Sequence, residues 1–390
     1  MSTHVLIAGV SARAAAESAA RADFRVTAID AFGDLDRHPG VRSLSLPRDF
    51  DTTFSAVAAA RAAREVECDA VAYVSNFENH PRAVRTLAGA RTLWGNPPDV
   101  LRRVRDPALL ARALRHRGFS VPALWKTPND LSDPNASKVW LVKPLRSGGG
   151  RRVRMWRGGV PLPRGCYLQE VVDGTPGSVV FAAAGGRAVP LGISRQLIGE
   201  SAFGAAGFAY CGSILASAGD AQFAHDGALV RAALGLAREV TEEFDLVGVN
   251  AVDFIARDGV PYPIEVNPRW SASMELVERV FGLSVFRAHA DACSSGVLPD
   301  SDLVTLRRGM GAVGKAVVFS RHDVTVGDTR PWLDDSSVRD VPHRGERIRA
   351  GSPVCTVFAR GSDSASCHAA LERRAERVYA EIADWERAAA

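Results

Sequence analysis

The chain has 390 residues, a formal net charge of +4, 46% hydrophobic residues and 24% charged residues. This length predicts two to three domains with ample apolar material for a core, and the composition excludes a disordered or repetitive protein. The modest charge, with no long run of basic residues, argues against nucleic-acid binding.

The start of the chain, MSTHVLIAGV, lacks the basic segment and the long apolar run of a signal peptide. No later run is long enough to span a bilayer, so we expect a cytoplasmic protein with no membrane partner. The six cysteines form no CxxC pair and no metal-ligand spacing with histidine, which favours buried, reduced thiols.

Residues 4–30 predict a strand, an alanine-rich helix and a second strand that ends at Asp30. Gly9 and Asp30 imitate a dinucleotide-binding fold, but the segment GVSAR is not GxGxxG. An open parallel sheet without a nicotinamide site is therefore the preferred interpretation.

A third α/β step follows, with a helix over residues 55–66 and the buried strand DAVAYVS. Glu78, Asn79 and His80 come after this strand, at the end where open α/β sheets bind ligands. They are candidate substrate contacts, and a capped turn is the alternative. Prolines 97 and 98 then place a boundary near residue 100.

The segment VWLVKPLRSGGG predicts a strand that ends in a glycine-rich loop. Three consecutive glycines let backbone N–H groups approach an anion without side-chain obstruction, and Lys143 adds a fixed positive charge. The segment is not a Walker loop, because it lacks GKS/T. A plain hairpin tip is the alternative to a phosphate-binding loop.

Residues 249–256 and 260–266 predict two strands joined by an Asp-Gly turn. Glu265 and Asn267 share a face because they are two residues apart, and we expect Ile264 and Val266 to pack behind them. Asp253 joins them if the turn holds three residues and faces away if it holds two. Two carboxylates and an amide oxygen on one face are hard ligands, which suits Mg²⁺ better than a soft metal. A solvated polar face is the alternative.

These three residues, with Glu-Val-Asn-Pro-Arg at 265–269, resemble the ATP-grasp superfamily of ATP-dependent ligases and carboxylases. The motif is similar to that of the carboligase and biotin carboxylase branch. The resemblance implies that Asp253, Glu265 and Asn267 bind Mg²⁺ or Mn²⁺, and that Arg269 lies beside a reacting acyl phosphate. Arg269 and Lys143 are then the expected catalytic residues.

The resemblance also implies an ATP site. Lys143 is expected on the nucleotide, under a loop that closes over the phosphates and comprises Ser147, Gly148, Gly149 and Gly150. Glu170, Val171 and Val172 match the segment that binds adenine. Arg195 and Gln196 are expected on a strand that faces the γ-phosphate, with a surface arginine as the alternative.

One position departs from the family pattern. Where the family has an Asp-Lys pair whose lysine reaches the nucleotide phosphates, this chain has Asp106-Pro107. Arg103, Arg105 and Lys126 are the alternatives for that contact.

The implied fold is α/β (α+β), an ATP-grasp fold preceded by a Rossmann-like domain and followed by a small β-rich domain. The expected boundaries are 1–100, 101–300 and 301–390, with the middle part divided into subdomains over about 120–175 and 176–300. A turn over residues 345–354 imitates a biotinyl domain, but it lacks the lysine that a swinging arm needs.

The function that follows is an ATP-dependent ligase that activates a small carboxylic acid as an acyl phosphate and joins it to an amine. A carboxylase acting through carboxyphosphate, and an ATP-binding regulatory protein without turnover, are the two alternatives. The substrates' identities stay open, and a homodimer is compatible with the sequence.

Overall fold

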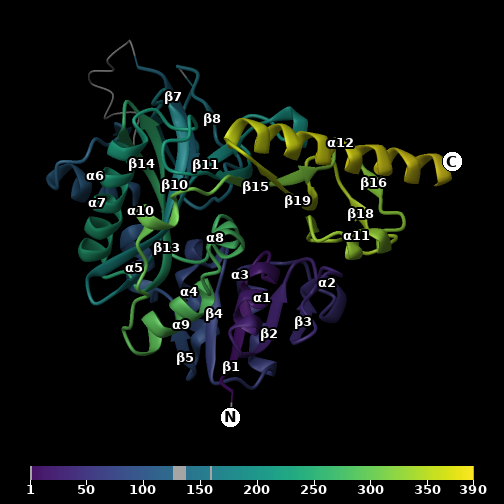
Figure 1. The fold of residues 1–390 in the computed structure, drawn as a ribbon. Helices are drawn as coiled ribbons and strands as arrows, with labels where there is room; N and C mark the ends of the chain where they lie inside the picture. Colours follow the sequence, from purple (N-terminus) through teal and green to yellow (C-terminus); the bar gives the residue numbers. More distant parts are fainter. Residues whose placement is uncertain (1, 126–137, 159, 390) are drawn as a thin grey trace.

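The computed structural model describes residues 2–125, 138–158 and 160–389. It contains one parallel sheet in the N-terminal part and antiparallel sheets in the rest of the chain, with helices between and around them (Figure 1). This arrangement confirms the predicted α/β class. None of the helices in the described part combines the length and the apolar composition needed to cross a bilayer.

The N-terminal sheet has five parallel strands in the order β3-β2-β1-β4-β5. Its elements are β1 (His4–Ala8), α1 (Arg13–Arg21), β2 (Arg25–Asp30), β3 (Val41–Ser45), α2 (Leu46–Asp49), α3 (Ala56–Ala62), η1 (Ala63–Glu65), β4 (Ala70–Tyr73), η2 (Phe77–Asn79), α4 (Pro81–Ala88) and β5 (Thr92–Trp94). Alternate residues of β1 enter two different cores: Val5 and Ile7 pack with α1, and Leu6 and Ala8 pack with α3. Both faces of this sheet are therefore covered, as parallel sheets require.

The carboxylate of Asp30 accepts hydrogen bonds from backbone N–H groups. It accepts hydrogen bonds from the N–H groups of Ala12 at 3.1 Å, Phe32 at 3.1 Å and Gly33 at 2.9 Å. Asp30 therefore fixes the turns at the end of β2, which agrees with the interpretation as a plain open sheet.

Two helices, α5 (Pro98–Val104) and α6 (Pro107–His116), lead to a small antiparallel sheet with the order β6-β9-β7-β8. Its strands are β6 (Leu124–Trp125), β7 (Trp140–Pro144), β8 (Arg154–Met155) and β9 (Cys166–Glu170). The glycine-rich loop connects β7 to β8.

The central sheet has eight strands in the order β14-β13-β10-β11-β12-β15-β19-β17. Its first part comprises β10 (Thr175–Ala184), β11 (Arg187–Ile198), η4 (Ser201–Phe203), β12 (Tyr210–Leu215), α7 (Asp226–Phe244), β13 (Gly248–Arg257), β14 (Val260–Asn267), α8 (Met274–Phe281) and α9 (Val285–Ser294). Val179 and Phe181 face α7, whereas Val180 and Ala182 share a core with α8, α9 and α1. This shared core joins the N-terminal and central sheets.

The central sheet continues past residue 300, because β15 pairs with β12. The C-terminal elements are α10 (Leu303–Leu306), β15 (Ala312–Phe319), β16 (Val324–Thr325), α11 (Arg330–Asp334), β17 (Val338–Arg339), β18 (Arg347–Ile348), β19 (Pro353–Gly361) and the long α12 (Ser364–Ala389). The predicted division at residues 100 and 300 stays a prediction, and its second boundary falls between strands of one sheet.

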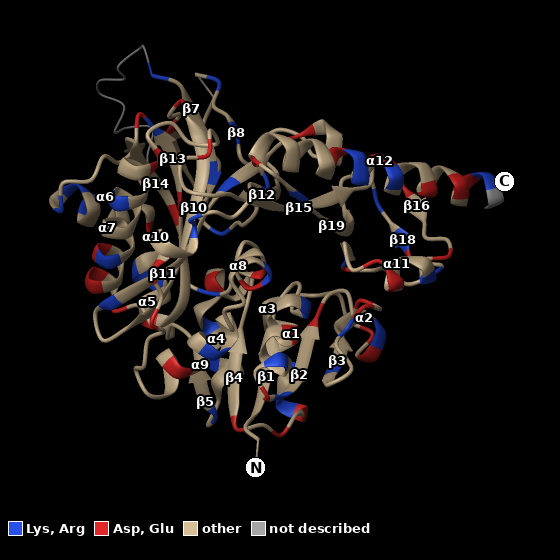
Figure 2. Ribbon diagram, in the orientation of Figure 1, with Lys and Arg blue, Asp and Glu red and all other residues tan. Residues whose placement is uncertain are grey.

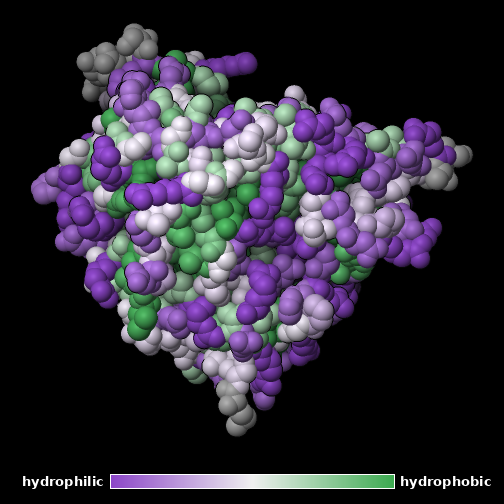
Figure 3. All heavy atoms as spheres, viewed as in Figure 1, coloured by the Kyte–Doolittle hydropathy of each residue, from purple (hydrophilic) through white to green (hydrophobic). Residues whose placement is uncertain are grey.

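The surface mixes both charge signs, as the helices α6, α7 and α12 show (Figure 2). On the face drawn in Figure 3, hydrophobic residues gather near the middle and hydrophilic ones surround them. All six cysteines are free thiols, and three of them, Cys211, Cys355 and Cys367, are buried.

Asn96 is a polar joint between the N-terminal and central sheets and is 0% exposed. Its Nδ2 donates to Asn250 Oδ1 at 2.8 Å and to the Pro268 carbonyl at 3.1 Å, and its Oδ1 accepts from the Val247 N–H at 2.9 Å. One side chain thus holds both ends of the β13–β14 hairpin.

Replacing Asn96 with alanine is expected to lower the free energy of unfolding by about 3 kcal/mol, because at least two buried polar partners lose their hydrogen bonds. Urea unfolding followed by tryptophan fluorescence measures this change. The exposed neighbour Thr92→Ala serves as the matched control and should stay within about 0.5 kcal/mol of the wild type.

Candidate functional site

A cavity of about 680 Å³ lies where the three sheets meet. Its walls come from the turns after β1 and β4, from the small sheet with its glycine-rich loop, and from the central sheet. Cavities of this size hold nucleotide-sized ligands, and the carboxyl ends of parallel strands are where α/β sheets bind them. Of the predicted site residues, the cavity brings together Lys143, Ser147, Gly148, Gly149, Gly150, Glu170, Val171, Val172, Asp253, Glu265, Asn267 and Arg269.

The β13–β14 hairpin presents its polar residues through a β-bulge. Arg257 pairs with Val260, so the turn holds two residues, Asp258 and Gly259, both with positive φ. Of the two turn lengths considered, the two-residue turn is present, and by itself it would turn Asp253 to the other face. The register shifts instead between Asp253 and Phe254, and the extra residue restores the pairing of Asp253 with Glu265.

Ile264 is the extra residue of this bulge, since Phe254 pairs with Pro263 and Asp253 with Glu265. The prediction that Ile264 packs behind the polar face is wrong, because Ile264 lines the cavity. Val266 does pack behind it, in the core against α7. A bulge re-aims a side chain in this way because it interrupts the two-residue period of the strand.

The three predicted metal ligands form one cluster. Asn267 Nδ2 donates to Asp253 Oδ2 at 2.9 Å, and Asp253 lies opposite Glu265. Burial, and then the neighbouring Glu265 carboxylate, raise the pKa of Asp253 to about 6. Burial alone would raise the pKa of Glu265 as well, but Arg105 and Lys143 together lower it. Two close carboxylates that differ this way fit a divalent cation with oxygen ligands.

Arg105 lies at the junction of the three walls. Its Nη1 donates to Glu265 Oε1 and, at 2.9 Å, to the Val266 carbonyl. Its Nη2 donates to Asn79 Oδ1 at 2.9 Å and to the Ser147 carbonyl at 3.1 Å. This guanidinium therefore ties the turn after β4, the glycine-rich loop and the metal-ligand strand together.

The other two alternatives for the unassigned phosphate contact differ from Arg105. Arg103 donates to the Glu243 carbonyl at 2.7 Å on an exposed surface. Lys126 lies outside the described residues. Asp106 caps α6 by accepting from the N–H groups of Ala108 at 2.8 Å and Leu109 at 3.3 Å. Of the three, Arg105 alone is shown beside the candidate metal ligands.

The glycine-rich loop is anchored on both sides. Tyr210 N–H donates to the Gly149 carbonyl at 3.1 Å, and Asn79 Nδ2 donates to the Ser147 carbonyl at 3.2 Å. At Gly150, φ is +71° and a Cβ would lie 1.7 Å from the Phe208 carbonyl oxygen. Lys143 lies below the loop, 9% exposed, and donates to Gln169 Oε1 at 2.9 Å.

The segment predicted to bind adenine, Glu170 to Val172, lines the cavity. The Glu170 carboxylate, however, already has two partners within the protein. Glu170 accepts from the Ala123 N–H at 2.9 Å and pairs with Lys138 at 2.9 Å. Burial raises the pKa of Glu170, and these two donors more than offset it, so the net shift is downward. Val171 N–H donates to the Val139 carbonyl at 2.8 Å.

Arg195 is the predicted site residue that the cavity does not include. Its neighbour Gln196 lines the cavity together with Ser178 and Asp253. Successive residues of a strand point to opposite faces, so the expectation that Arg195 and Gln196 both face the phosphates is wrong. Arg195 lies close enough to His368, on the other face, to act against the protonation of that imidazole.

Arg269 binds the turn after β4. Its Nη2 donates to Glu78 Oε1 at 2.9 Å and to Asn267 Oδ1 at 2.8 Å, while Nη1 donates to the Trp270 carbonyl at 3.1 Å. Of the candidate substrate contacts, Glu78 lines the cavity, whereas Asn79 and His80 are not among the residues that line it. Asn79 is connected to the site through Arg105 and the Ser147 carbonyl.

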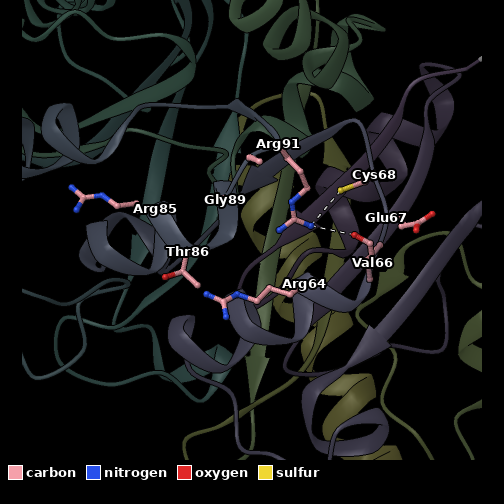
Figure 4. A pocket seen from close by; sticks show the side chains of 9 residues that line it. Arg64, Val66, Glu67, Cys68, Arg85, Thr86, Gly89 and Arg91 are labelled. Atoms are coloured by element: carbon pink, nitrogen blue, oxygen red, sulfur yellow. Dashed lines mark hydrogen bonds between the residues drawn. The ribbon is translucent and has the colours of Figure 1, made fainter.

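A second hollow, of about 640 Å³, lies at the opposite, amino end of β4 (Figure 4). The Arg91 guanidinium in it is occupied by the carbonyl groups of Ala63, Val66 and Leu87 and by Cys68 Sγ. Arg91 thus clamps the end of α3 to α4. The hollow is wide open and lies away from the carboxyl edge of the sheet, which leaves the first cavity as the candidate active site.

Comparison with known proteins agrees with this geometry. Residues 104–273 match the ATP-grasp domain family. An uncharacterized protein of Methanocaldococcus jannaschii is 20% identical over 354 residues, which span 88% of this chain and 80% of the relative.

Solved structures share the fold over nearly the whole chain. The L-amino acid ligase from Bacillus licheniformis has a TM-score of 0.67 at 17% identity, with 96% of this chain and 97% of that chain covered. Biotin carboxylase from Campylobacter jejuni has a TM-score of 0.69 at 13% identity, with 94% and 89% covered. For N5-carboxyaminoimidazole ribonucleotide synthetase from Thermotoga maritima the TM-score is 0.67 at 14% identity, with 96% and 98% covered. The predicted fold is confirmed.

Replacing Gly150 with alanine is expected to weaken ATP binding at least about tenfold, because the Cβ collides with the Phe208 carbonyl and a positive φ strains alanine by about 1–3 kcal/mol. Isothermal titration with a non-hydrolysable ATP analogue measures the affinity. Gly148→Ala is the matched control, since a Cβ there meets nothing within 4 Å. Equal affinities of the two variants would contradict a phosphate-binding role for this loop.

Replacing Asp253 with asparagine is expected to stabilise the metal-free protein above pH 6 and to weaken Mg²⁺ binding. A carboxyl group whose folded pKa is raised from 3.8 to about 6 holds its proton more tightly when folded. Stability is therefore lost as pH rises through this window, by up to about 3 kcal/mol.

Thermal unfolding in EDTA at pH 5 and pH 8 measures this effect. The advantage of Asp253→Asn should appear at pH 8 and shrink at pH 5. Asp258→Asn, an exposed change in the same hairpin, is the control and should show no such dependence. A variant less stable than the wild type at pH 8 would contradict the raised pKa of Asp253 that burial and the Glu265 carboxylate produce.

Proposed function

Because this chain is an ATP-grasp domain protein, we propose that it is an ATP-dependent ligase that joins a small carboxylic acid to an amine. The products are an amide, ADP and phosphate. The observation that carries the proposal is one cavity in which three oxygen ligands, a lysine with a glycine-rich loop, and Arg269 lie together.

The residues of the cavity fit ATP with Mg²⁺. Lys143 and the N–H groups from Ser147 to Gly150 supply positive charge for phosphates, and the backbone of Val171 and Val172 borders the place for the base. Asp253, Glu265 and Asn267 are the hard oxygen donors that Mg²⁺ prefers. When bound, Mg²⁺ offsets the charge on the transferring phosphoryl group.

The role of Arg269 follows from its position. It extends from the metal-ligand strand toward Glu78, so its guanidinium lies between the proposed phosphate site and the N-terminal wall of the cavity. There it orients the substrate carboxylate and stabilises the charge of the acyl phosphate. Glu78 and Asn267 fix the guanidinium, which is how a preorganised donor is kept in place.

A carboxylase acting through carboxyphosphate is the second candidate. The motif Glu-Val-Asn-Pro-Arg favours it, and the fold is shared with biotin carboxylase as well as with L-amino acid ligase. A regulatory ATP-binding protein is the third, motivated by Pro107 in place of a phosphate-binding lysine. The position of Arg105 beside Glu265 supports an active site despite that replacement.

The test is ADP release from Mg·ATP across a panel of carboxylic acids and amines, with bicarbonate as a separate series. We expect release that requires both an acid and an amine, and we expect Glu265→Gln to lower it by about a hundredfold or more, since a metal ligand is lost. Release that requires only bicarbonate would assign the carboxylase. ATP binding without release in any series would assign the regulatory protein.

A further inference from the structure

The cavity extends beyond the proposed phosphate site to a region that we call the acceptor side. It is lined by Ser11, Asn76, Glu78, Glu275, Lys315 and Asp340. Glu78 stands nearest the reacting centre, because it contacts Arg269 directly, and its side chain is 0% exposed.

One oxygen of this buried carboxylate is unused. Glu78 Oε1 accepts from Arg269, but Oε2 has no hydrogen-bond partner among the described residues. Asn76 Oδ1, in the same turn, also lacks a partner within that part of the chain. A buried polar atom left without a partner is destabilising, and one on a residue that lines a cavity can be completed by a ligand.

These two atoms are acceptors, so the group that completes them must donate, whereas Arg269 Nε, which also lacks a partner among the described residues, needs an acceptor. An ammonium group offers three N–H donors and a positive charge, and it matches a carboxylate best. Bicarbonate, in contrast, would bring a negative charge to two acceptors. Glu78 Oε2 and Asn76 Oδ1 thus suit an amine, and Arg269 Nε beside them suits the carboxylate of the acid substrate.

The charged residues around the acceptor side are paired with one another. Lys315 of the acceptor side is already paired with Glu275, at 2.6 Å. The adjoining Arg13 is paired with Glu275 at 3.0 Å and with Asp340 at 2.7 Å. Arg13 also meets Glu17 at 3.1 Å and Asp36 at 3.7 Å. Arg279 also contacts Glu275 at 3.7 Å, and Arg339 contacts Asp36 at 3.8 Å. The acids of this wall are therefore already paired with cations, and the unpaired oxygen of Glu78 is the carboxylate atom left for a cationic group.

We propose that Glu78 binds the amine substrate in its ammonium form and takes the proton that this group must lose before it attacks. This inference rests on the proposed ligase function and adds the binding site of its second substrate. The proton moves from nitrogen to Glu78 Oε2 and later to solvent. The nitrogen lone pair then bonds to the carbonyl carbon of the acyl phosphate, the C–O bond to phosphate breaks with its electron pair on phosphate, and phosphate takes the second proton of the nitrogen.

The test separates the two half-reactions in Glu78→Gln. This change keeps an oxygen for Arg269 and replaces the free acceptor with a donor. Amide formation from an alkyl amine should fall by about a hundredfold or more, as for the loss of a general base. ATP-dependent hydroxamate formation with hydroxylamine should stay within about threefold of the wild type, because hydroxylamine is already neutral at neutral pH.

Other results would contradict either this inference or the proposed function. Amide formation at the wild-type rate would overturn the inference, and so would a matching loss of amide and hydroxamate. A wild-type enzyme that forms neither product with any acid would instead refute the proposed function. Glu78→Asp, which retracts the carboxylate, should show the same split and serves if Glu78→Gln does not fold. Glu67→Gln, an exposed change at the other end of β4 (Figure 4), should alter neither product.

Discussion

The rest of the site depends on two carboxylates, Asp253 and Glu265, which lie opposite each other on neighbouring strands. Side chains at such positions are about 5 Å apart, and like charges there repel. The environment shifts the pKa values of the two carboxyl groups in opposite directions. Arg105 and Lys143 keep Glu265 ionised, whereas Asp253 has a pKa raised to about 6. Burial leaves Asp253 harder to ionise than a solvated carboxyl group, and a divalent cation bound there would favour its charged form.

Buried arginines also connect segments that are far apart in the sequence. Arg105 bonds to Asn79, Ser147 and Glu265, which belong to three different walls of the cavity. Arg13 does the equivalent between α1 and two distant segments, through Glu275 and Asp340. A planar guanidinium with five donors suits these joints better than a lysine. The walls of the cavity are thereby connected through charge as well as through apolar packing.

Much of this could be predicted from the sequence, because it rests on local patterns. The alternating apolar residues predicted the strands, and the residue types predicted the hard-ligand cluster. The bulge at Ile264 could not be predicted, because no residue type in this strand signals the break in its two-residue period. The two-residue turn was foreseen as one of two options, but its effect on Asp253 was reversed by the bulge.

Other errors have different physical causes. Arg195 was placed toward the phosphates beside Gln196, although alternation lets only one of two successive strand residues face a cavity. The engagement of Glu170 by Lys138, and the role of Arg105 as a junction, depend on contacts between distant segments. The unused oxygen of Glu78 is also a property of the assembled fold, because it requires knowing what every neighbour already binds.

The continuity of the central sheet across residue 300 has a practical consequence for dissecting the protein. β12 is hydrogen-bonded to β15, and β15 to β19, so strands from beyond residue 300 belong to the same sheet as the β13–β14 hairpin. A fragment cut at residue 300 would expose the backbone of β12 as a raw edge, open to pairing with other molecules. Any shortened version of this protein must therefore keep the C-terminal part, whose residues Lys315 and Asp340 also line the cavity.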